Sequence, residues 1–283
     1  MRNSNRVIIP GNGRFWRAPV DTPPPGQLLR ILGAPTSADV TATVNAEATS
    51  AVALGGAASQ DADMLALVQA IAGLPTVGSG RVSLLPASMT NPFSYLVFID
   101  PAVTTQTLTA AATFTGGSTP SIEVVTSAVG LGAWDDWTEI GHTSKDSPLQ
   151  VNRSGGDTTV LDTWQESGVD ASTAATQFAL AYTLLQYDVD SMKLYYGSNA
   201  TFAENGMLQT AAANPAATEH ALLLQILNGN KAEWRHYPRV STIAADGENF
   251  DTTKLAGMPI KSTILSSATF AFGQQLSQVG VAA

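Results

Sequence analysis

Apolar and polar residues alternate in short runs along most of this chain, which is the pattern of β-strands that bury one face. The clearest run spans residues 173–186. The apolar side chains of that run are Phe178, Leu180, Tyr182 and Leu184. The side chains between them are small or polar. Turn signals rich in Gly, Pro, Asn and Ser separate the runs, so we expect a mainly β protein.

Strand patterns also occur before and after this run. The expected strands are 14–19, 27–32, 40–49, 80–85, 94–99, 107–114, 121–126, 137–142, 149–154, 157–164, 219–227, 231–237 and 258–272. Gly155-Gly156 lies between 149–154 and 157–164, and a glycine pair between two strand runs predicts a long hairpin with its turn at the glycines. Asn228-Gly229 is a type I′ turn signal and predicts a second hairpin.

Two segments have helical rather than strand spacing. In the first, apolar residues recur three and four apart, with Ser59 as the expected N-cap and Gly73-Leu74-Pro75 as the end. Those apolar residues are Met64, Leu65, Val68, Ile71 and Ala72. In the second, shorter segment, Asp188 is the expected N-cap and Gly197 the end. We expect its apolar face to comprise Val189, Met192 and Tyr196.

Composition suits a chain with a sizeable core and little surface charge. Of 283 residues, 44% are hydrophobic and only 13% are charged, against roughly 25% charged in an average domain. A soluble chain with so little charge often hides surface in an assembly, although a monomeric β-protein rich in Thr, Ser and Ala has the same composition. The composition therefore leaves both classes open.

Charge is unevenly distributed along the chain. Net charge is −9, yet residues 1–37 hold five Arg and one Asp. Tight nucleic-acid binding needs Lys and Arg to displace counterions, so the acidic body argues against it. The acidic surface either repels nucleic acid or is simply solvated. The N-terminal arginines Arg2, Arg6, Arg14 and Arg17 either contact a neighbouring subunit or are exposed.

Catalytic and cofactor chemistry is not expected. Without cysteine, disulfides and Cys-based metal or nucleophile sites are excluded, and the three histidines match no metal spacing. His142 near Ser144 and Asp146, and the pair Asp135-Asp136, match no nucleophile motif. The start of the chain lacks the apolar core of a signal peptide, and no apolar run approaches the roughly 20 residues of a membrane span. We therefore expect no enzyme, cofactor or membrane insertion.

Domain organisation follows from a change in composition. Residues 38–128 are rich in Ala, Thr, Ser, Gly and Val and nearly lack basic residues. Their pattern of one helix and several strands has about the size of a domain. We expect an inserted α+β domain at 38–128, with 1–37 and 129–283 forming one discontinuous β domain.

A resemblance to a known family enters after residue 129. The sequence carries Trp137-Thr138-Glu139-Ile140-Gly141-His142-Thr143-Ser144, Gly155-Gly156-Asp157-Thr158, Thr163-Trp164-Gln165 and Leu194-Tyr195-Tyr196-Gly197 in order. With this spacing it resembles the major tail tube protein of long, flexible-tailed phages of actinobacteria. The likeness covers 129–275 and, loosely, 5–36. Residues 38–128 are similar to a small module of virion and surface proteins.

The resemblance implies a β-sandwich or half-barrel subunit with one short helix and a long hairpin. Hexameric rings of it would stack into a tube that delivers viral DNA. Its partners would be further copies, and the tape measure, tail terminator and distal tail proteins. It would be made in the host bacterial cytoplasm and reside in the virion tail. A cell-surface or carbohydrate-binding β-module is the alternative. An inserted domain would project outward, as decoration, as a stiffener or for weak glycan binding.

Candidate lumen residues follow from this resemblance, because DNA slides past acidic and small hydroxylated side chains but is held by Lys and Arg. The candidates are Asp157, Asp162, Glu166, Gln177 and Thr183. The scattered tryptophans at positions 16, 134, 137, 164 and 234 suit core and interface roles better than a glycan site.

Overall fold

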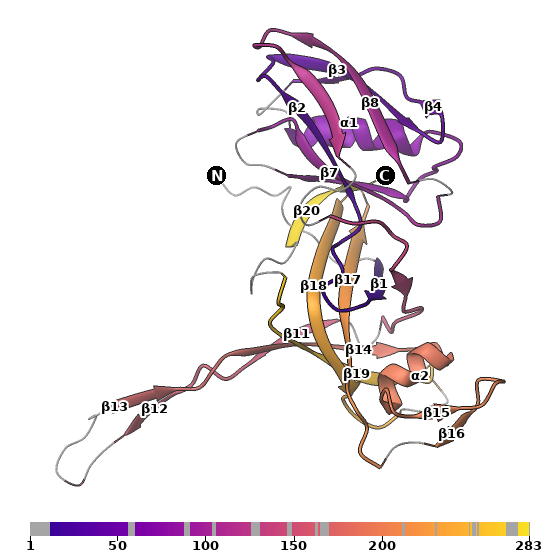
Figure 1. The fold of residues 1–283 in the computed structure, drawn as a ribbon, viewed down its shortest axis with the longest axis vertical. Helices are drawn as coiled ribbons and strands as arrows, with labels where there is room; N and C mark the ends of the chain where they lie inside the picture. Colours follow the sequence, from indigo (N-terminus) through magenta and orange to yellow (C-terminus); the bar gives the residue numbers. More distant parts are fainter. Residues whose placement is uncertain are drawn as a thin grey trace.

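The computed structural model shows a mainly β molecule with two units stacked along its long axis and a thin arm leaving the lower unit (Figure 1). The structure describes residues 12–55, 60–87, 91–103, 106–125, 131–145, 149–161, 164, 170–210, 213–229, 231–248, 250, 253, 255–269 and 277–282. Among these residues there are two helices, and strands form most of the rest.

The lower unit is an antiparallel sheet that curls around its own core. Its strand order is β10 (Thr138–Glu139), β1 (Asn12–Ala18), β17 (Thr218–Asn228), β18 (Lys231–Ala244), β19 (Met258–Ile264), β14 (Gln177–Leu184) and β11 (Gln150–Ser154). Phe15 of β1 and Tyr182 of β14 are separated by three strands in this order. Their rings nevertheless stack with centroids 4.8 Å apart, so the sheet closes into a half-barrel.

The segment after β10 closes the gap between the ends of the curled sheet. The Ile140 amide donates to the Phe15 carbonyl over 2.8 Å, and the Ser144 amide donates to the Thr183 carbonyl over 2.9 Å. Gly141 lies between them with φ of 90°, where a Cβ would meet the Gln186 side chain at 2.2 Å. Only glycine accepts this conformation readily. The expected strand 137–142 is therefore a strand only at Thr138–Glu139, which pairs with β1, and the chain then crosses to β14.

Helix α2 (Val189–Tyr196) packs beside β18 and β19 and closes the barrel core. The Asp188 carboxylate accepts from the Ser191 amide over 2.7 Å, and the Gly197 amide, at φ of 96°, donates to the Lys193 carbonyl. Both predicted caps are confirmed. A small ribbon, β15 (Thr201–Phe202) and β16 (Leu208–Thr210), follows the helix. The sequence pattern had not indicated it.

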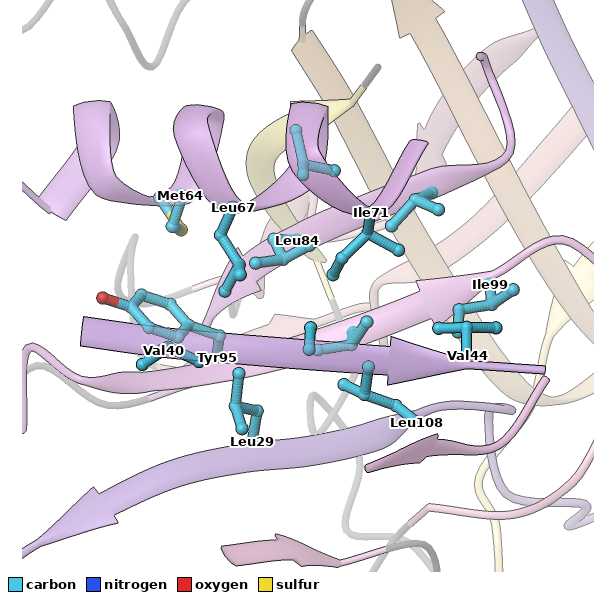
Figure 2. Close-up of a cluster of buried hydrophobic side chains, with 14 of the residues drawn as sticks. Leu29, Val40, Val44, Met64, Leu67, Ile71, Leu84, Tyr95, Ile99 and Leu108 are labelled. Atoms are coloured by element: carbon cyan, nitrogen blue, oxygen red, sulfur yellow. The ribbon is translucent and has the colours of Figure 1, made fainter. Parts of the chain in front are cut away.

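The upper unit is a two-sheet sandwich with a helix beside it. One sheet is β6 (Val82–Pro86), β7 (Ser94–Ile99), β2 (Gln27–Leu32) and β9 (Ser121–Val125). The other contains β4 (Glu47–Ala48), β3 (Ser37–Val44), β5 (Val52–Leu54) and β8 (Leu108–Thr115). Figure 2 shows α1 (Gln60–Ala72) laying Met64, Leu67 and Ile71 onto the core between the sheets. The expected N-cap Ser59 lies outside the described residues.

A single sheet continues from one unit into the other. The long strand β18 pairs with β17 along one edge. Its other edge is shared, since Lys231–Arg235 pairs with β20 (Ser277–Ala282) and Val240–Ala244 pairs with β19. Because β20 also pairs with β6, this last strand connects the barrel to the sandwich. No strand had been predicted at 277–282.

A tryptophan cluster fills the junction between the units. Trp234 of β18 stacks on Phe98 of β7 with centroids 4.4 Å apart and on Trp16 of β1 at 5.7 Å. Its indole nitrogen donates to the Ser83 hydroxyl of β6 over 3.1 Å, and the Trp134 indole donates to the Ile99 carbonyl. All of these aromatic side chains are buried, so the two units share a core.

Three further sequence predictions for these two units differ from the structure. The strand expected at 40–49 is two strands, because Asn45 and Ala46 both have positive φ and form a tight turn between β3 and β4. The strand expected at 258–272 ends at Ile264, and 270–272 lie outside the described residues. The third difference concerns Gln27–Leu32, expected in the discontinuous β domain. It pairs with β7 and β9 of the upper unit.

Candidate assembly interface

The arm that leaves the lower unit is a long two-stranded ribbon, but its turn is not at the predicted place. β11 pairs with β14, and β12 (Thr158–Leu161) pairs with β13 (Asp170–Thr173). The predicted hairpin between 149–154 and 157–164 is therefore wrong. Instead, 150–161 forms one leg of the ribbon and 170–184 forms the other. The expected strand at 173–186 is likewise split, into β13 and β14.

Gly155 and Gly156 kink the ribbon instead of ending it. The Gly156 amide donates to the Ala174 carbonyl and the Ala174 amide donates to the Asp157 carbonyl, so the ladder continues across the glycines. Both have positive φ, and a Cβ on Gly155 would meet the Ala175 carbonyl oxygen at 2.2 Å. The register is unchanged across the glycines, because Ser154 pairs with Gln177 and Thr158 pairs with Thr173. Glycine suits a position with positive φ inside a ribbon as well as at its turn, which is why the sequence pattern misled.

The arm has exposed side chains on both faces. Every residue of β11 is exposed although the strand is paired, and Thr158, Thr159 and Val160 of β12 are exposed as well. Val160 is 57% exposed, Val151 is 47% exposed, and Trp164 near the tip is fully exposed. Figure 1 shows the ribbon projecting far from the body. No other segment among the described residues covers these faces, and an isolated two-stranded ribbon is marginal in water.

Of the lumen candidates, three fall within the described residues. Asp157 is exposed at the base of β12, and Gln177 is exposed at the start of β14. Thr183 lies near the other end of β14, half-buried beside Gly257. Asp162 and Glu166 lie outside the described residues. Asp157 and Gln177 thus accompany the arm, whereas Thr183 belongs to the barrel wall.

The predicted alternation along β14 is confirmed from Leu180 onward, whereas Phe178, the first apolar residue of the predicted face, is only half-buried. Leu180, Tyr182 and Leu184 are buried in the barrel core. Burial raises the pKa of Tyr182 to about 12, with a partial opposing effect from its hydrogen bond to Ser262. The opposite row is only partly solvated, because Ala179 is 7% exposed. The face of β14 that holds the lumen candidates Gln177 and Thr183 is therefore open to solvent mainly at Gln177.

The four arginine candidates divide into two pairs. Arg2 and Arg6 lie outside the described residues. Arg14 and Arg17 are in β1, inside the sheet and not in a free arm. Arg14 pairs with Glu139 over 2.9 Å and with Asp100 of the upper unit, and its guanidinium lies over the Trp16 ring. The hydrogen bond to Glu139 and the nearby Asp100 charge raise the pKa of Arg14 against its burial. Arg17 pairs with Asp190 over 2.9 Å.

The residues weighed for catalysis do not converge. His142 is exposed, Asp135 and Asp136 are exposed next to the buried Trp134, and Asp146 lies outside the described residues. Among the described residues no cluster of His, Asp and Glu could hold a metal ion. No helix in the described part of the chain is long and apolar enough to cross a membrane.

A long ribbon that projects from the body with both faces exposed is typical of a structural β subunit that contacts other chains. A family model described as phage tail tube protein matches residues 99–276, more than half of the chain. This chain belongs to the phage tail tube protein family and is a structural component of a phage tail. The match begins at the end of β7, so it includes part of the upper unit.

Two relatives carry the same kind of description. The chain is similar to the Major tail protein Gp23 of Mycobacterium phage D29 and to that of Mycobacterium phage L5. Each is 28% identical over 131 residues, which is 46% of this chain and 64% of the relative. The chain thus spans less than two thirds of the length of these relatives.

Proposed function

We propose that this chain is the major tail tube subunit of a long-tailed phage, and that hexameric rings of it stack into a hollow tail for DNA delivery. The observation that carries the proposal is the arm, which is exposed on both faces and carries a fully exposed Trp164. Membership of the tail tube protein family supports it. The hexameric ring is taken from the family resemblance.

Strand edges give the proposed ring its contacts. Among described residues, β11 pairs only with β14, and Asn12–Arg14 of β1 has no strand on its outer side. Open edges tend to pair with other chains. In a ring, the β11 edge and arm of one copy would lie against the β1 edge of the next, and the sheet would close without a free edge.

A channel lined by these strands would carry acidic or neutral side chains. We assign Asp157, Asp162, Glu166 and Gln177 to the lumen or its rim, and Thr183 to the wall behind. Phosphates are repelled by carboxylates and gain little from amides or hydroxyls. DNA would then pass without specific binding. The same tube would meet a tape measure protein inside and terminator and distal tail proteins at its ends.

The upper unit is the inserted domain of this proposal. Because Gln27–Leu32 pairs within it, we place the boundaries nearer to residues 26 and 131 than to 38 and 128. The tail tube domain is then discontinuous and takes β1 from the N-terminal side. We propose that the inserted unit decorates the outside of the tube, held at a fixed angle by the tryptophan cluster and β20.

Electron microscopy and sedimentation of the purified chain test the assembly. We expect rings or hollow tubes above a threshold concentration. A variant with Asp157–Thr173 replaced by a two-residue Asn-Gly turn shortens the arm at the kink. It should keep the thermal midpoint of the body within a few degrees and lose assembly. Thr113→Ser, on the exposed face of β8, is the matched control and should still assemble.

Two results would contradict this proposal. A monomer at every concentration would refute the proposal, and glycan binding by that monomer would favour the surface-binding alternative. Tubes formed by the shortened variant would show that the arm is not the contact.

A further inference from the structure

The curled sheet of the lower unit has a second face, which points away from the barrel core. Leu180 of β14 and Ile260 of β19 are buried in that core. Side chains alternate between the two faces along a strand, and directly paired residues of antiparallel strands share a face. The residues between the core positions of β11, β14, β19 and β18 therefore form one surface, which we call the polar face (Figure 1).

Strand register assigns two rows of side chains to the polar face. One row crosses β11, β14, β19 and β18 at Asn152, Ala179, Thr263 and Ser241. The next row crosses β11, β14 and β19 at Gln150, Ala181 and Lys261. We define the polar face by these two rows. Gln150, Asn152 and Lys261 are exposed, and Ala179 is the one buried member.

The polar face is neutral except at one position. Its amides, hydroxyls and methyl groups carry no charge, and Ser241 is followed in its row by Glu219 of β17. The Glu219 carboxylate accepts two hydrogen bonds from the Arg239 guanidinium, over 2.7 and 3.0 Å, so its charge is neutralised. Lys261 is exposed and pairs with no carboxylate of the described residues. Each subunit therefore has one unpaired positive charge on its polar face.

This chemistry differs from the acidic wall that the sequence suggested. Asp157 lies in the arm beyond the glycine kink, and Asp162 and Glu166 lie outside the described residues. A lysine on a solvated strand is ordinary in a monomer. In a ring, symmetry repeats the same position in every copy, so an unpaired Lys261 becomes a circle of ammonium groups. The charge of such a circle complements the phosphate backbone of a nucleic acid.

We propose that the polar face lines the channel and that Lys261 is its contact with the phosphates of passing DNA. The inference rests on the proposed tube and names the chemistry of its wall. The ammonium group of lysine is a compact, hydrated point charge, without the planar fork by which arginine forms paired hydrogen bonds to a phosphate. Each contact is therefore easily broken and remade, and the neutral residues around Lys261 add no charge that attracts phosphates. Such a wall holds DNA weakly and lets it slide.

Cysteine labelling tests where the polar face lies, because the chain has no native cysteine. Asn152→Cys and Lys261→Cys are each assembled and then treated with a small maleimide, or with a maleimide on a polymer too large to enter the tube. The small reagent should label both variants in tubes, and the polymer should label them only in dissociated chains. Thr113→Cys, on the exposed face of β8, is the matched control and should accept both reagents in either state.

Retention of a short fluorescent DNA duplex by sedimented tubes tests the phosphate contact. We expect retention at low salt that is lost as salt is raised, because each contact releases counterions. Lys261→Gln should lower retention about 5-fold at low salt, and Lys261→Arg should restore it. Arg81→Gln removes the same charge from an exposed site on the sandwich and should leave retention unchanged. No retention by unmodified tubes, or equal retention by Lys261→Gln tubes, would overturn the contact.

The labelling results separate this inference from the tube itself. If tubes form and the polymer labels positions 152 and 261, the polar face lies outside, and the inference fails while the tube stands. If the small reagent is also blocked in tubes, the polar face is a contact between copies, and the inference fails again. If electron micrographs show no tubes, the proposed function and the inference fail together.

Discussion

Replacing Trp234 by alanine should uncouple the two units as well as destabilise the chain. The Trp234 side chain is 2% exposed and packs between Phe98 of the sandwich and Trp16 of the barrel. Truncation of a buried tryptophan or phenylalanine costs about 3–5 kcal/mol. Each of the two stacked ring pairs contributes about 0.5–1.5 kcal/mol, and part of this contribution is already included in the truncation cost.

The hydrogen bond of the indole adds little to this cost. The Ser83 hydroxyl loses the Trp234 donor but keeps the Gln225 amide at 3.4 Å, so it is not left unpartnered. We therefore expect a loss of about 4 kcal/mol in the free energy of unfolding. Trp234→Phe keeps the stacking and loses the indole N–H and part of the ring volume. It should cost about 1–2 kcal/mol.

Guanidinium chloride unfolding, followed by far-ultraviolet circular dichroism and tryptophan fluorescence, measures both effects. In the native chain the two signals should coincide, because the units share a core and β20. In Trp234→Ala they should separate. Leu67→Ala removes a fully buried side chain from the sandwich core alone and should lose stability without separating the signals. A loss below about 1 kcal/mol for Trp234→Ala, with coincident signals, would refute the shared-core argument.

Three further outcomes follow from the same contacts. Deleting 38–128 with a short linker, which the sequence alone suggested the fold would tolerate, should leave the purified product aggregated or unfolded by circular dichroism. It removes both strand partners of β2 and the cover of the tryptophan cluster. The pKa values of His220 and His236 are lowered to about 4, mainly by burial. Below pH 6.5 these histidines are protonated in the unfolded chain but stay neutral in the folded chain, so the free energy of unfolding should fall from pH 6.5 to about 4. His236→Gln should reduce the dependence of the thermal midpoint on pH in this range. Gly155→Val should abolish assembly measured by sedimentation and leave the melting of the body nearly unchanged, because the clash with Ala175 lies in the arm.

Local pattern predicted much of this fold from sequence. β2 and β7 fall on their expected bounds, α2 has both of its expected caps, and three of the four expected apolar residues of β14 lie in the barrel core. These features depend on residues close together in the chain. The strand β20 was missed because Ser277–Ala282 is short and has little apolar alternation. It is a strand because β18 and β6 present open edges on both sides of it.

The pairing between strands that are distant in the chain could not be predicted from the local pattern of residues. Composition suggested that a domain begins at residue 38, yet β2 precedes that point and belongs to the sandwich. That Gln27–Leu32 forms a strand could be predicted from its own alternation of apolar and polar residues. Which strands lie beside it depends on the topology of the whole sheet and could not. Arg14 is a similar case, since a charged residue near a terminus gives no sign that Asp100 and Glu139 are folded against it.

The role of the glycine pair at 155–156, as a turn or as a kink, determines which surface residues 149–164 can contact. As a turn, it would make 149–164 a compact hairpin against the body, with both legs available for a channel wall. As a kink, it lets the ladder run on to the tip near Trp164 and directs that part away from the barrel. A strand against the barrel can line a channel in its own subunit. A ribbon that no described segment of its own chain supports is suited to meet another copy, so we expect the arm residues to contact a neighbouring subunit at the rim of the proposed channel.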